Sequence, residues 1–369
     1  MTETAITNIN TYSSESGSFS KKNILIKDEK INAILPANHI PEHISVINGS
    51  DLFLTPGFID TCSQIGLKEK GIRWEGDDGM EPDETKSEKL HVLDGIYPFD
   101  KAFHDAVSSG VTAAHIVSSA ESIVGARTAV IHTHGHTVED MALHKNLGYS
   151  YSMGDLPKKT FWERTGTPLT RMGIAHKIRR SLNDLQKEKN LKEQLLFIRC
   201  HRADDIATAY RIAEEFGIDF VFVHATEYRK LKKPILNYPK AIVAGPYFQP
   251  IERAELKNLD PADCFFFHKQ AINYTFSTDH PTNSVTHLQL EGSLAVKNGV
   301  PEHQVLNALT KDAAKLLNID HKTGDIQEGL FADLVLWNGH PLSLTSKAVR
   351  TFIKGKEVYR EAEKNASYI

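Results

Sequence analysis

The stretch Pro56-Gly57-Phe58-Ile59-Asp60 (PGFID) marks the point at which the pattern of the chain changes. A proline–glycine turn leads there into a short apolar run, which is typical of a buried strand. Beyond it, short apolar runs such as residues 111–117 (VTAAHIV), 195–201 (LLFIRCH) and 219–224 (DFVFVH) alternate with helical stretches. This alternation predicts parallel strands joined by crossover helices. The length of the region, about 270 residues, suits a closed (β/α)8 barrel.

Both ends of the chain carry a different pattern, in which apolar and polar residues alternate. Residues 23–27 (NILIK) and 30–35 (KINAIL) flank the turn-like pair Asp28-Glu29, which predicts a β-hairpin. Alternation returns near the end of the chain, at residues 332–337, 348–354 and 357–359. We therefore expect the two ends to pair into one small β-sandwich. The predicted domain limits are residues 1–53 and 329–369 for the sandwich, and 54–328 for the barrel.

Composition excludes several classes of partner. The chain has 369 residues, of which 40% are hydrophobic and 24% charged, with a formal net charge of −4 and no basic run of the kind that binds nucleic acid. No segment has the ~18 apolar residues that cross a membrane, and the N-terminus lacks the pattern of a signal peptide. Cys62, Cys200 and Cys264 show no CxxC spacing, which is typical of reduced thiols. We expect a cytoplasmic protein with a small-molecule substrate or ligand, and we leave homo-oligomerisation open.

Further motifs follow PGFID and Gly66 in a fixed order. They are residues 167–173 (TPLTRMG), 201–206 (HRADDI), 224–227 (HATE), 277–281 (STDHP) and 332–335 (ADLV). The series resembles the amidohydrolase superfamily, in its imidazolonepropionase-like and prolidase-like branch. That resemblance implies an α/β fold, a distorted (β/α)8 TIM barrel with a small β-sandwich built from both chain termini.

The resemblance also implies a site for one or two divalent metals, which lower the pKa of a bound water that attacks an amide or related carbon. The first barrel strand of the family usually supplies two histidines separated by one residue. Cys62 and Gln64 stand at these positions here. A cysteine thiolate can bind zinc, but glutamine is a poor zinc ligand, so we expect this half of the site to be absent.

The remaining family positions are kept unevenly. His224 is the best-kept metal-ligand candidate, His201 and Asp155 are further candidates, and Arg199 stands where the fifth strand usually has its first histidine. Asp279 matches the acid that takes a proton from the attacking water, and Asp279 and its neighbour His280 are the predicted catalytic residues. A strand-end or loop role without a metal is the alternative for His224 and Asp155.

Two outcomes follow from this uneven set. In one, His224, His201 or Cys62, and Asp155 hold a single metal, zinc being the first choice, with Asp279 as the base. In the other, no metal is bound, and the Arg199 guanidinium pairs with Asp279 or Asp155 at that position. The second outcome is the one that ligand chemistry favours.

Other residues are candidates for contact with substrate. Arg171 could hold a carboxylate bidentately, Arg199 could do so in a metal-free site, and Glu75 lies in an acidic loop expected at the mouth of the barrel. His132, His134 and His136 alternate along an expected strand, which indicates either a metal site or an exposed strand face.

The leading functional hypothesis is a hydrolase of a carbon–nitrogen bond in a small amide, cyclic amide or dipeptide-like molecule, with one metal at most. The alternative is a catalytically inactive binding or scaffold protein on the same fold, in which Arg199 replaces the metal. The sequence does not identify the substrate, because specificity depends on the shapes of loops.

Overall fold

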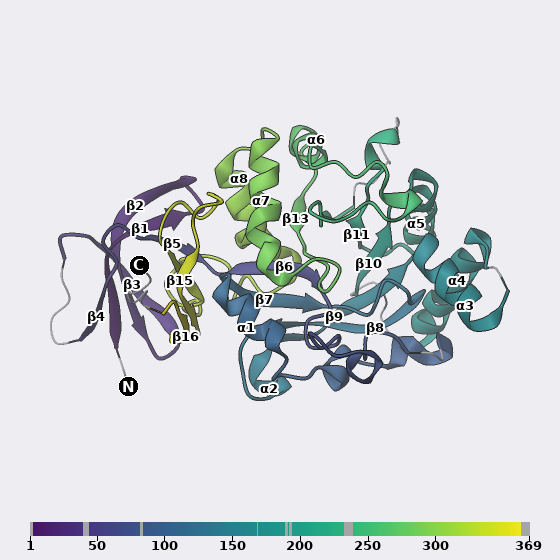
Figure 1. The fold of residues 1–369 in the computed structure, drawn as a ribbon, viewed down its shortest axis with the longest axis horizontal. Helices are drawn as coiled ribbons and strands as arrows, with labels where there is room; N and C mark the ends of the chain where they lie inside the picture. Colours follow the sequence, from purple (N-terminus) through teal and green to yellow (C-terminus); the bar gives the residue numbers. More distant parts are fainter. Residues whose placement is uncertain are drawn as a thin grey trace, which may run out of the picture.

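The computed structural model describes residues 3–39, 44–81, 84–167, 169–188, 191, 194–231 and 239–362. Pro168, which belongs to the TPLTRMG motif, lies outside the described residues. The described chain forms two eight-stranded sheets and the helices that surround one of them. Figure 1 shows the two sheets side by side along the longest axis.

The first sheet curls into a nearly closed barrel with the strand order β13-β12-β11-β10-β9-β8-β7-β6. Its two end strands meet through the Thr61 hydroxyl on β6, which lies 2.9 Å from Thr275 Oγ1 and donates to the Phe276 carbonyl at 2.8 Å on β13. The strands are β6 (Phe58–Ser63), β7 (Val111–Ile116), β8 (Val124–His132), β9 (Ala142–Ser152), β10 (Leu195–Cys200), β11 (Phe220–His224), β12 (Ala241–Ala244) and β13 (Tyr274–Phe276).

One strand of the barrel corrects the expectation of a purely parallel sheet. β8 runs antiparallel to both β7 and β9, whereas the other neighbouring pairs are parallel. The connection from β7 to β8 has no helix, and only the four-residue helix α2 (Val138–Met141) joins β8 to β9. A parallel pair needs a crossover of about a dozen residues or more, so connections this short force a reversal of direction.

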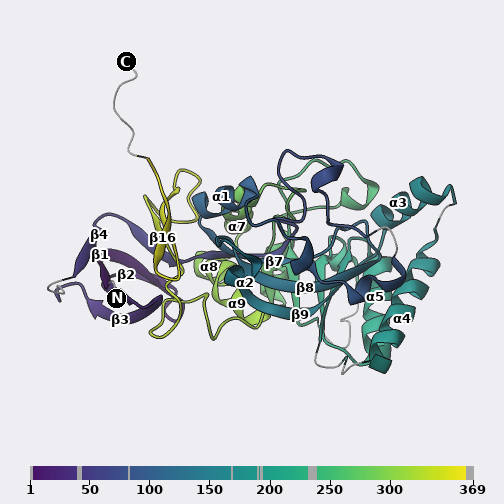
Figure 2. The same ribbon diagram turned by 90° about the horizontal axis from the view of Figure 1, so that it is seen from below.

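Helices cover the outside of the barrel (Figures 1 and 2). In α5 (Ala203–Phe216) the buried residues Ile206, Ala209, Ile212, Ala213 and Phe216 recur at helical spacing, and Gly217 ends the helix with a φ of 62°. The other helices are α1 (Lys101–Ser108), α3 (Asp155–Thr165), α4 (Arg171–Glu188), α6 (Asp263–Lys269), α7 (Leu288–Lys297), α8 (Glu302–Leu309) and α9 (Lys311–Leu316).

The second sheet, which we call the terminal sheet, is built from both ends of the chain, as predicted. Its order is β16-β15-β14-β5-β1-β2-β3, with β4 beside β1. Asp28 and Glu29 form the predicted hairpin turn, with φ values of 46° and 71°. The strands are β1 (Thr4–Ser13), β2 (Ser18–Lys27), β3 (Lys30–Pro36), β4 (Ser45–Asn48), β5 (Phe53–Pro56), β14 (Leu334–Trp337), β15 (Ala348–Ile353) and β16 (Lys356–Arg360).

A buried hydrogen-bonded pair joins the barrel to the residue before β14. His132 ends β8, and its Nε2 lies 2.9 Å from Asp333 Oδ2, with both side chains buried. The Asp333 carboxylate also accepts from the Lys354 backbone N–H at 2.8 Å, so one acid connects three segments. His132 therefore has a structural partner in the fold, and the expected run of alternating histidines ends with the strand at this residue.

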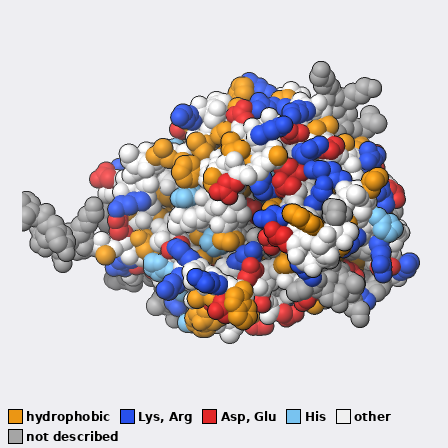
Figure 3. Space-filling view, turned by 45° about the vertical axis from the view of Figure 1, so that its right-hand side comes forward, with side chains coloured by type: hydrophobic (Ala, Val, Ile, Leu, Met, Phe, Trp, Pro, Cys, Tyr) orange, Lys and Arg blue, Asp and Glu red, His pale blue; other side chains and the backbone are white. Residues whose placement is uncertain are grey.

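The surface agrees with the charge pattern of the sequence. On the face drawn in Figure 3, cationic and acidic side chains lie interspersed, with small apolar patches between them. Within the described residues, the helices are all too short or too polar to cross a lipid bilayer.

Candidate active site

The strands of the barrel bring the predicted site residues to one end. All strands except β8 run in the same direction, so their carboxyl ends meet at one edge, which we call the barrel mouth. Cys62 lies near the end of β6, Arg199 near the end of β10, and His224 ends β11. Asp279 follows β13 by three residues. The floor of the barrel mouth is therefore formed by these four side chains.

The Arg199 guanidinium lies at the centre of this floor. Its Nη1 donates to the Ser118 carbonyl at 2.6 Å, and its Nη2 contacts both Cys62 Sγ at 3.1 Å and Asp279 Oδ1 at 2.5 Å. Only 4% of Arg199 is exposed. Burial works against its charge, but the interactions with Asp279 and Cys62 outweigh that effect and raise the pKa of Arg199. The guanidinium is thus a permanent cation, fixed in place between β6, β10 and the loop after β13.

Asp279 is held from both sides. Its backbone N–H donates to Ser277 Oγ at 2.8 Å, and its Oδ2 accepts from Thr282 Oγ1 at 3.2 Å. Its φ of 48° is in the left-handed region, which the neighbouring contacts must maintain. Asp60 supplies one of these contacts, because its Oδ1 accepts from the backbone N–H of Thr278 at 3.1 Å. Burial raises the pKa of Asp60 to about 6.

Two stacked imidazoles complete the floor. The rings of His201 and His224 lie 4.6 Å apart and 5° from parallel. His224 Nδ1 donates to the Gly245 carbonyl at 2.7 Å, and His201 Nδ1 lies 2.8 Å from Thr226 Oγ1. Burial lowers the pKa of both imidazoles, and the charges of Arg199 and Arg253 act in the same direction. Both are therefore neutral near pH 7.

A divalent metal fits His224 but not the set as a whole. A neutral histidine that donates Nδ1–H to a carbonyl presents Nε2 as a lone pair, which is how metal-binding histidines are usually oriented. His224 Nε2 faces Asp279 Oδ2 at 3.7 Å. The other oxygen of Asp279 is taken by Arg199, however, and among the described residues no three His, Cys, Asp or Glu side chains gather in a way that could hold a metal ion. A guanidinium in contact with the acid and the cysteine is chemically incompatible with a dication at the same place.

The structure places Asp155 outside this floor set. Asp155 begins α3, and its Oδ1 accepts from Arg253 Nη1 at 2.5 Å. It also interacts with Glu255, whose pKa is raised to about 7, first by burial and then by the nearby acids. Asp155 thus belongs to a charged cluster on the wall of the barrel mouth.

The predicted substrate-binding residues Arg171 and Glu75 and the predicted catalytic residue His280 fall in different surroundings. Arg171 Nε donates to Asp205 at 2.9 Å, and its Nη2 donates to the buried Glu255 at 2.6 Å. Glu75 lies in an exposed 3₁₀ turn, Trp74–Gly76. His280 is buried, and its carbonyl accepts from the Gln64 backbone N–H at 2.8 Å. The bonds of Arg171 to Asp205 and Glu255 give it a structural role, because they join α4 to α5 and to the loop after β12.

A cavity of about 570 Å³ opens at the barrel mouth. Gln64 lies in its wall, together with Arg253 and Thr282. The other lining residues are Lys68, Ser119, Ala120, Glu121, Leu156, Lys159, Gln249, Pro250, Glu252, Leu256 and Pro281. The volume is in the range of pockets that hold small molecules.

Sequence reasoning missed Arg253 and Ser118. Ser118 contributes only its backbone carbonyl, which no sequence pattern announces. Arg253 carried a usable signal, because it stands in the loop after the short apolar run at 242–245, where barrel loops build active sites.

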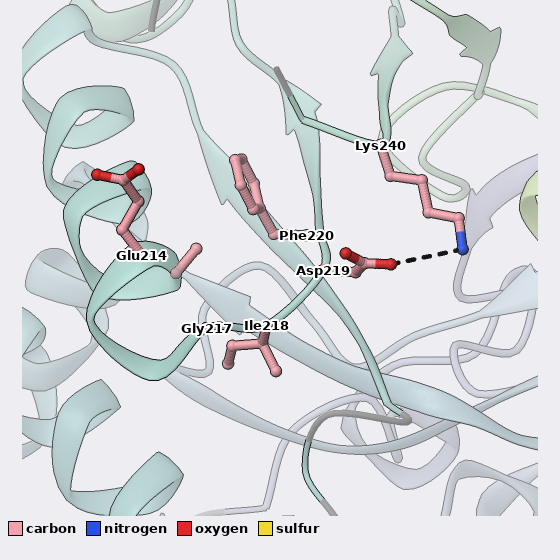
Figure 4. A pocket seen from close by; sticks show the side chains of 7 residues that line it. Glu214, Gly217, Ile218, Asp219, Phe220 and Lys240 are labelled. Carbon is pink, nitrogen blue, oxygen red and sulfur yellow. Dashed lines mark ion pairs between the residues drawn. The ribbon is translucent and has the colours of Figure 1, made fainter. Parts of the chain in front are cut away.

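A second cavity, of about 420 Å³, lies at the opposite ends of the strands, where β11 and β12 begin. Figure 4 shows Asp219 pointing toward Lys240, whose Nζ is 3.9 Å from the carboxylate, with Phe220 and Ile218 on the wall. None of the predicted site residues lines this cavity.

Comparison with known proteins gives a consistent result. The sequence model of the amidohydrolase family matches residues 266–358 of this chain. The amidohydrolase tasK of Hapsidospora irregularis is 22% identical over 88% of this chain, and the chain spans only 38% of the length of that relative.

Solved structures extend the likeness over the whole chain. An amidohydrolase from Thermotoga maritima MSB8 is 31% identical, with a TM-score of 0.88, over 97% of this chain and 100% of the other. A beta-aspartyl dipeptidase from Fervidobacterium islandicum AW-1 is 15% identical, with a TM-score of 0.61, over 97% of both chains, and it shares the fold. The chain therefore belongs to the amidohydrolase family, the class of proteins named for hydrolysis of carbon–nitrogen bonds and generally dependent on divalent metals.

Proposed function

We propose that the barrel mouth binds a small amide, cyclic amide or dipeptide-like molecule, and that Arg199 takes the place of the metal that the family generally uses. The contact of the Arg199 guanidinium with Asp279 Oδ1, at 2.5 Å, is the observation that carries this proposal. A guanidinium neutralises the acid but gives no water the acidity that a metal would. Recognition of a ligand is what the remaining geometry supports best.

The floor is rigid in a way that suits recognition. Arg199, Asp279 and His224 are buried, and each has a fixed hydrogen-bond partner. A ligand in the cavity would meet Thr282, whose bond to Asp279 ties it to polar groups that are already set in place, so little ordering is needed on binding. The cavity reaches the floor at Thr282, which lines it and donates to Asp279 Oδ2, and it is large enough for a dipeptide-sized molecule.

Hydrolysis is a second candidate, and the orientation of His224 favours it. Its Nε2 and Asp279 Oδ2 face each other at 3.7 Å, next to the cavity end of the strands. A water that contacts both atoms from the side could pass a proton to Asp279 Oδ2, which also accepts a bond of 3.2 Å from Thr282 Oγ1. The names of the similar proteins point to the same class of reaction.

A ligand panel distinguishes the two candidates. The purified protein is mixed with small amides, lactams and dipeptides, its melting temperature is measured, and products are sought by chromatography. We expect one or more compounds to raise the melting temperature without being cleaved, because a ligand of the folded state stabilises it. Cleavage that persists in EDTA would support hydrolysis without a metal, and a panel with no effect of either kind would contradict the proposal.

A further inference from the structure

We infer that Arg253 binds a carboxylate of the molecule that the barrel mouth receives, with Asp155 as its partner in the absence of ligand. The inference rests on the proposed function and narrows the ligand class. It points to amides that also carry a carboxylate, such as N-acyl amino acids and dipeptides.

The arginines near the barrel mouth differ in what holds them. Arg199 is buried and already bonded to Ser118, Cys62 and Asp279. Arg171 is held by Asp205 and Glu255, whose side chains are only 2% and 3% exposed. Releasing either arginine would leave a buried acid without its cation, which is strongly unfavourable.

Arg253 is held much less firmly. Its side chain is 25% exposed, and its partner Asp155 is 33% exposed. Water can therefore solvate Asp155 when a ligand takes its place on Arg253. Exchange of one carboxylate for another at a partly exposed arginine costs little free energy, because the arginine keeps an acidic partner and water solvates the released acid.

The position of Arg253 also suits a ligand that reaches the floor. Arg253 lines the cavity of about 570 Å³ and lies just before the 3₁₀ turn Ala254–Leu256. Its positive charge contributes to lowering the pKa of both His201 and His224. Thr282 lines the same cavity and donates to Asp279 Oδ2 at 3.2 Å, so a ligand whose carboxylate pairs with Arg253 would also lie beside the Asp279 side of the floor.

The other cations of the cavity wall are less suited to this task. Lys68 pairs with Asp77 at 3.2 Å, and Lys159, which is mostly exposed, pairs with Glu163 at 3.7 Å. An ammonium is a point charge, whereas a guanidinium matches a carboxylate with two parallel hydrogen bonds. Arg253 is therefore the specificity-determining residue that we assign.

The test compares two probes that differ in one group, N-acetyl-L-proline and N-acetyl-L-prolinamide. Their dissociation constants are measured by ligand-observed NMR for the wild type, Arg253→Met and Asp155→Asn. Arg179→Met serves as the control, because Arg179 has a comparable ion pair with Glu215, at 2.7 Å, away from the cavity. Circular dichroism confirms that each variant is folded.

We expect the wild type and Arg179→Met to prefer the carboxylate probe by about tenfold, the usual effect of one charge-assisted bidentate contact. Arg253→Met should lose this preference, and Asp155→Asn should bind the carboxylate probe more tightly than the wild type does. A preference that survives in Arg253→Met, or a wild type that binds both probes equally, would overturn the inference alone. A wild type that binds neither probe, and no other amide of the panel, would overturn the proposed function as well.

Discussion

Arg199 decides the character of the barrel mouth at the scale of single residues. It stands where the resemblance predicts a histidine ligand, and the structure shows its guanidinium in contact with Asp279 and Cys62. Cys62 supports this arrangement as a neutral partner of Arg199, because burial raises the pKa of its thiol to about 12. An arginine at this position gives the floor a fixed cation, which contacts both an acid and a thiol.

Replacing Arg199 by methionine should destabilise the protein, because it leaves the Asp279 carboxylate buried without its cation. Loss of one partner of a buried ion pair costs about 3–5 kcal/mol. Urea denaturation would measure the change in the free energy of unfolding. The double variant Arg199→Met with Asp279→Asn removes both charges, keeps a residue that tolerates the left-handed φ of 48°, and should recover most of the loss. Equal stability of Arg199→Met and the wild type would contradict the account of this ion pair.

The sequence identified which residues to examine at the site but not their partners. The motifs predict Arg199, His224 and Asp279 as site residues. They leave two acids, Asp279 and Asp155, as possible partners of Arg199. The true neighbour of Asp155 is Arg253, about a hundred residues further on. A partner this distant depends on how two loops fold over the barrel, which no local pattern specifies.

At the scale of elements, ion pairs of very different burial connect the helices around the barrel mouth. Arg171 on α4 bridges Asp205 on α5 and Glu255 in the loop after β12. Arg202 pairs with Asp204 at the start of α5, and both of these side chains are about half exposed. The acids that Arg171 contacts are buried, whereas the ion pair of Arg202 and Asp204 is exposed to solvent.

Arg171→Met and Arg202→Met should therefore differ in stability, although each removes an arginine from an ion pair. We expect a loss of about 3 kcal/mol or more for Arg171→Met, because two buried acids lose their cation. The loss for Arg202→Met should be about 1 kcal/mol or less. Thermal and urea unfolding of the two variants would measure both, and similar losses would contradict this difference.

The elements themselves were largely predictable. The hairpin of β2 and β3, helix α5 and strands β10 and β11 lie where apolar periodicity and the turn residues Asp28 and Glu29 predict them. β8 was not predictable as an antiparallel strand, since apolar runs of parallel and antiparallel strands read alike once both faces are buried. Domain limits at residues 53 and 328 stay a prediction.

At the scale of the whole molecule, the barrel and the terminal sheet are joined by the buried pair of His132 and Asp333. Burial alone would raise the pKa of Asp333, but its interaction with His132 and its hydrogen bonds outweigh burial, so the pKa is lowered. A carboxyl whose pKa is lower in the folded protein stabilises it above the ordinary pKa of an aspartate. That contribution is lost as the pH falls through the lowered value.

His132→Gln should therefore reduce stability near neutral pH by about 3 kcal/mol. The difference from the wild type should begin to shrink below about pH 4, where this aspartate takes up a proton in the unfolded chain, and should vanish below the lowered pKa of folded Asp333. Urea unfolding at pH 7, 5 and 3 would follow this difference. His136→Gln is the matched control, since His136 is exposed on the same segment and should have little effect at any pH. A difference that stays constant with pH would show that the Asp333 carboxylate is not its source.

The central claim concerns the metal, and metal content tests it most directly. The wild type is purified without a chelator or histidine tag, offered zinc or manganese, freed of loose ions by gel filtration, and examined by elemental analysis. The account predicts well below one equivalent of metal per chain, because the guanidinium of Arg199 holds Asp279 and excludes a dication. About one equivalent of metal, lost when His224 is replaced by alanine, would contradict it.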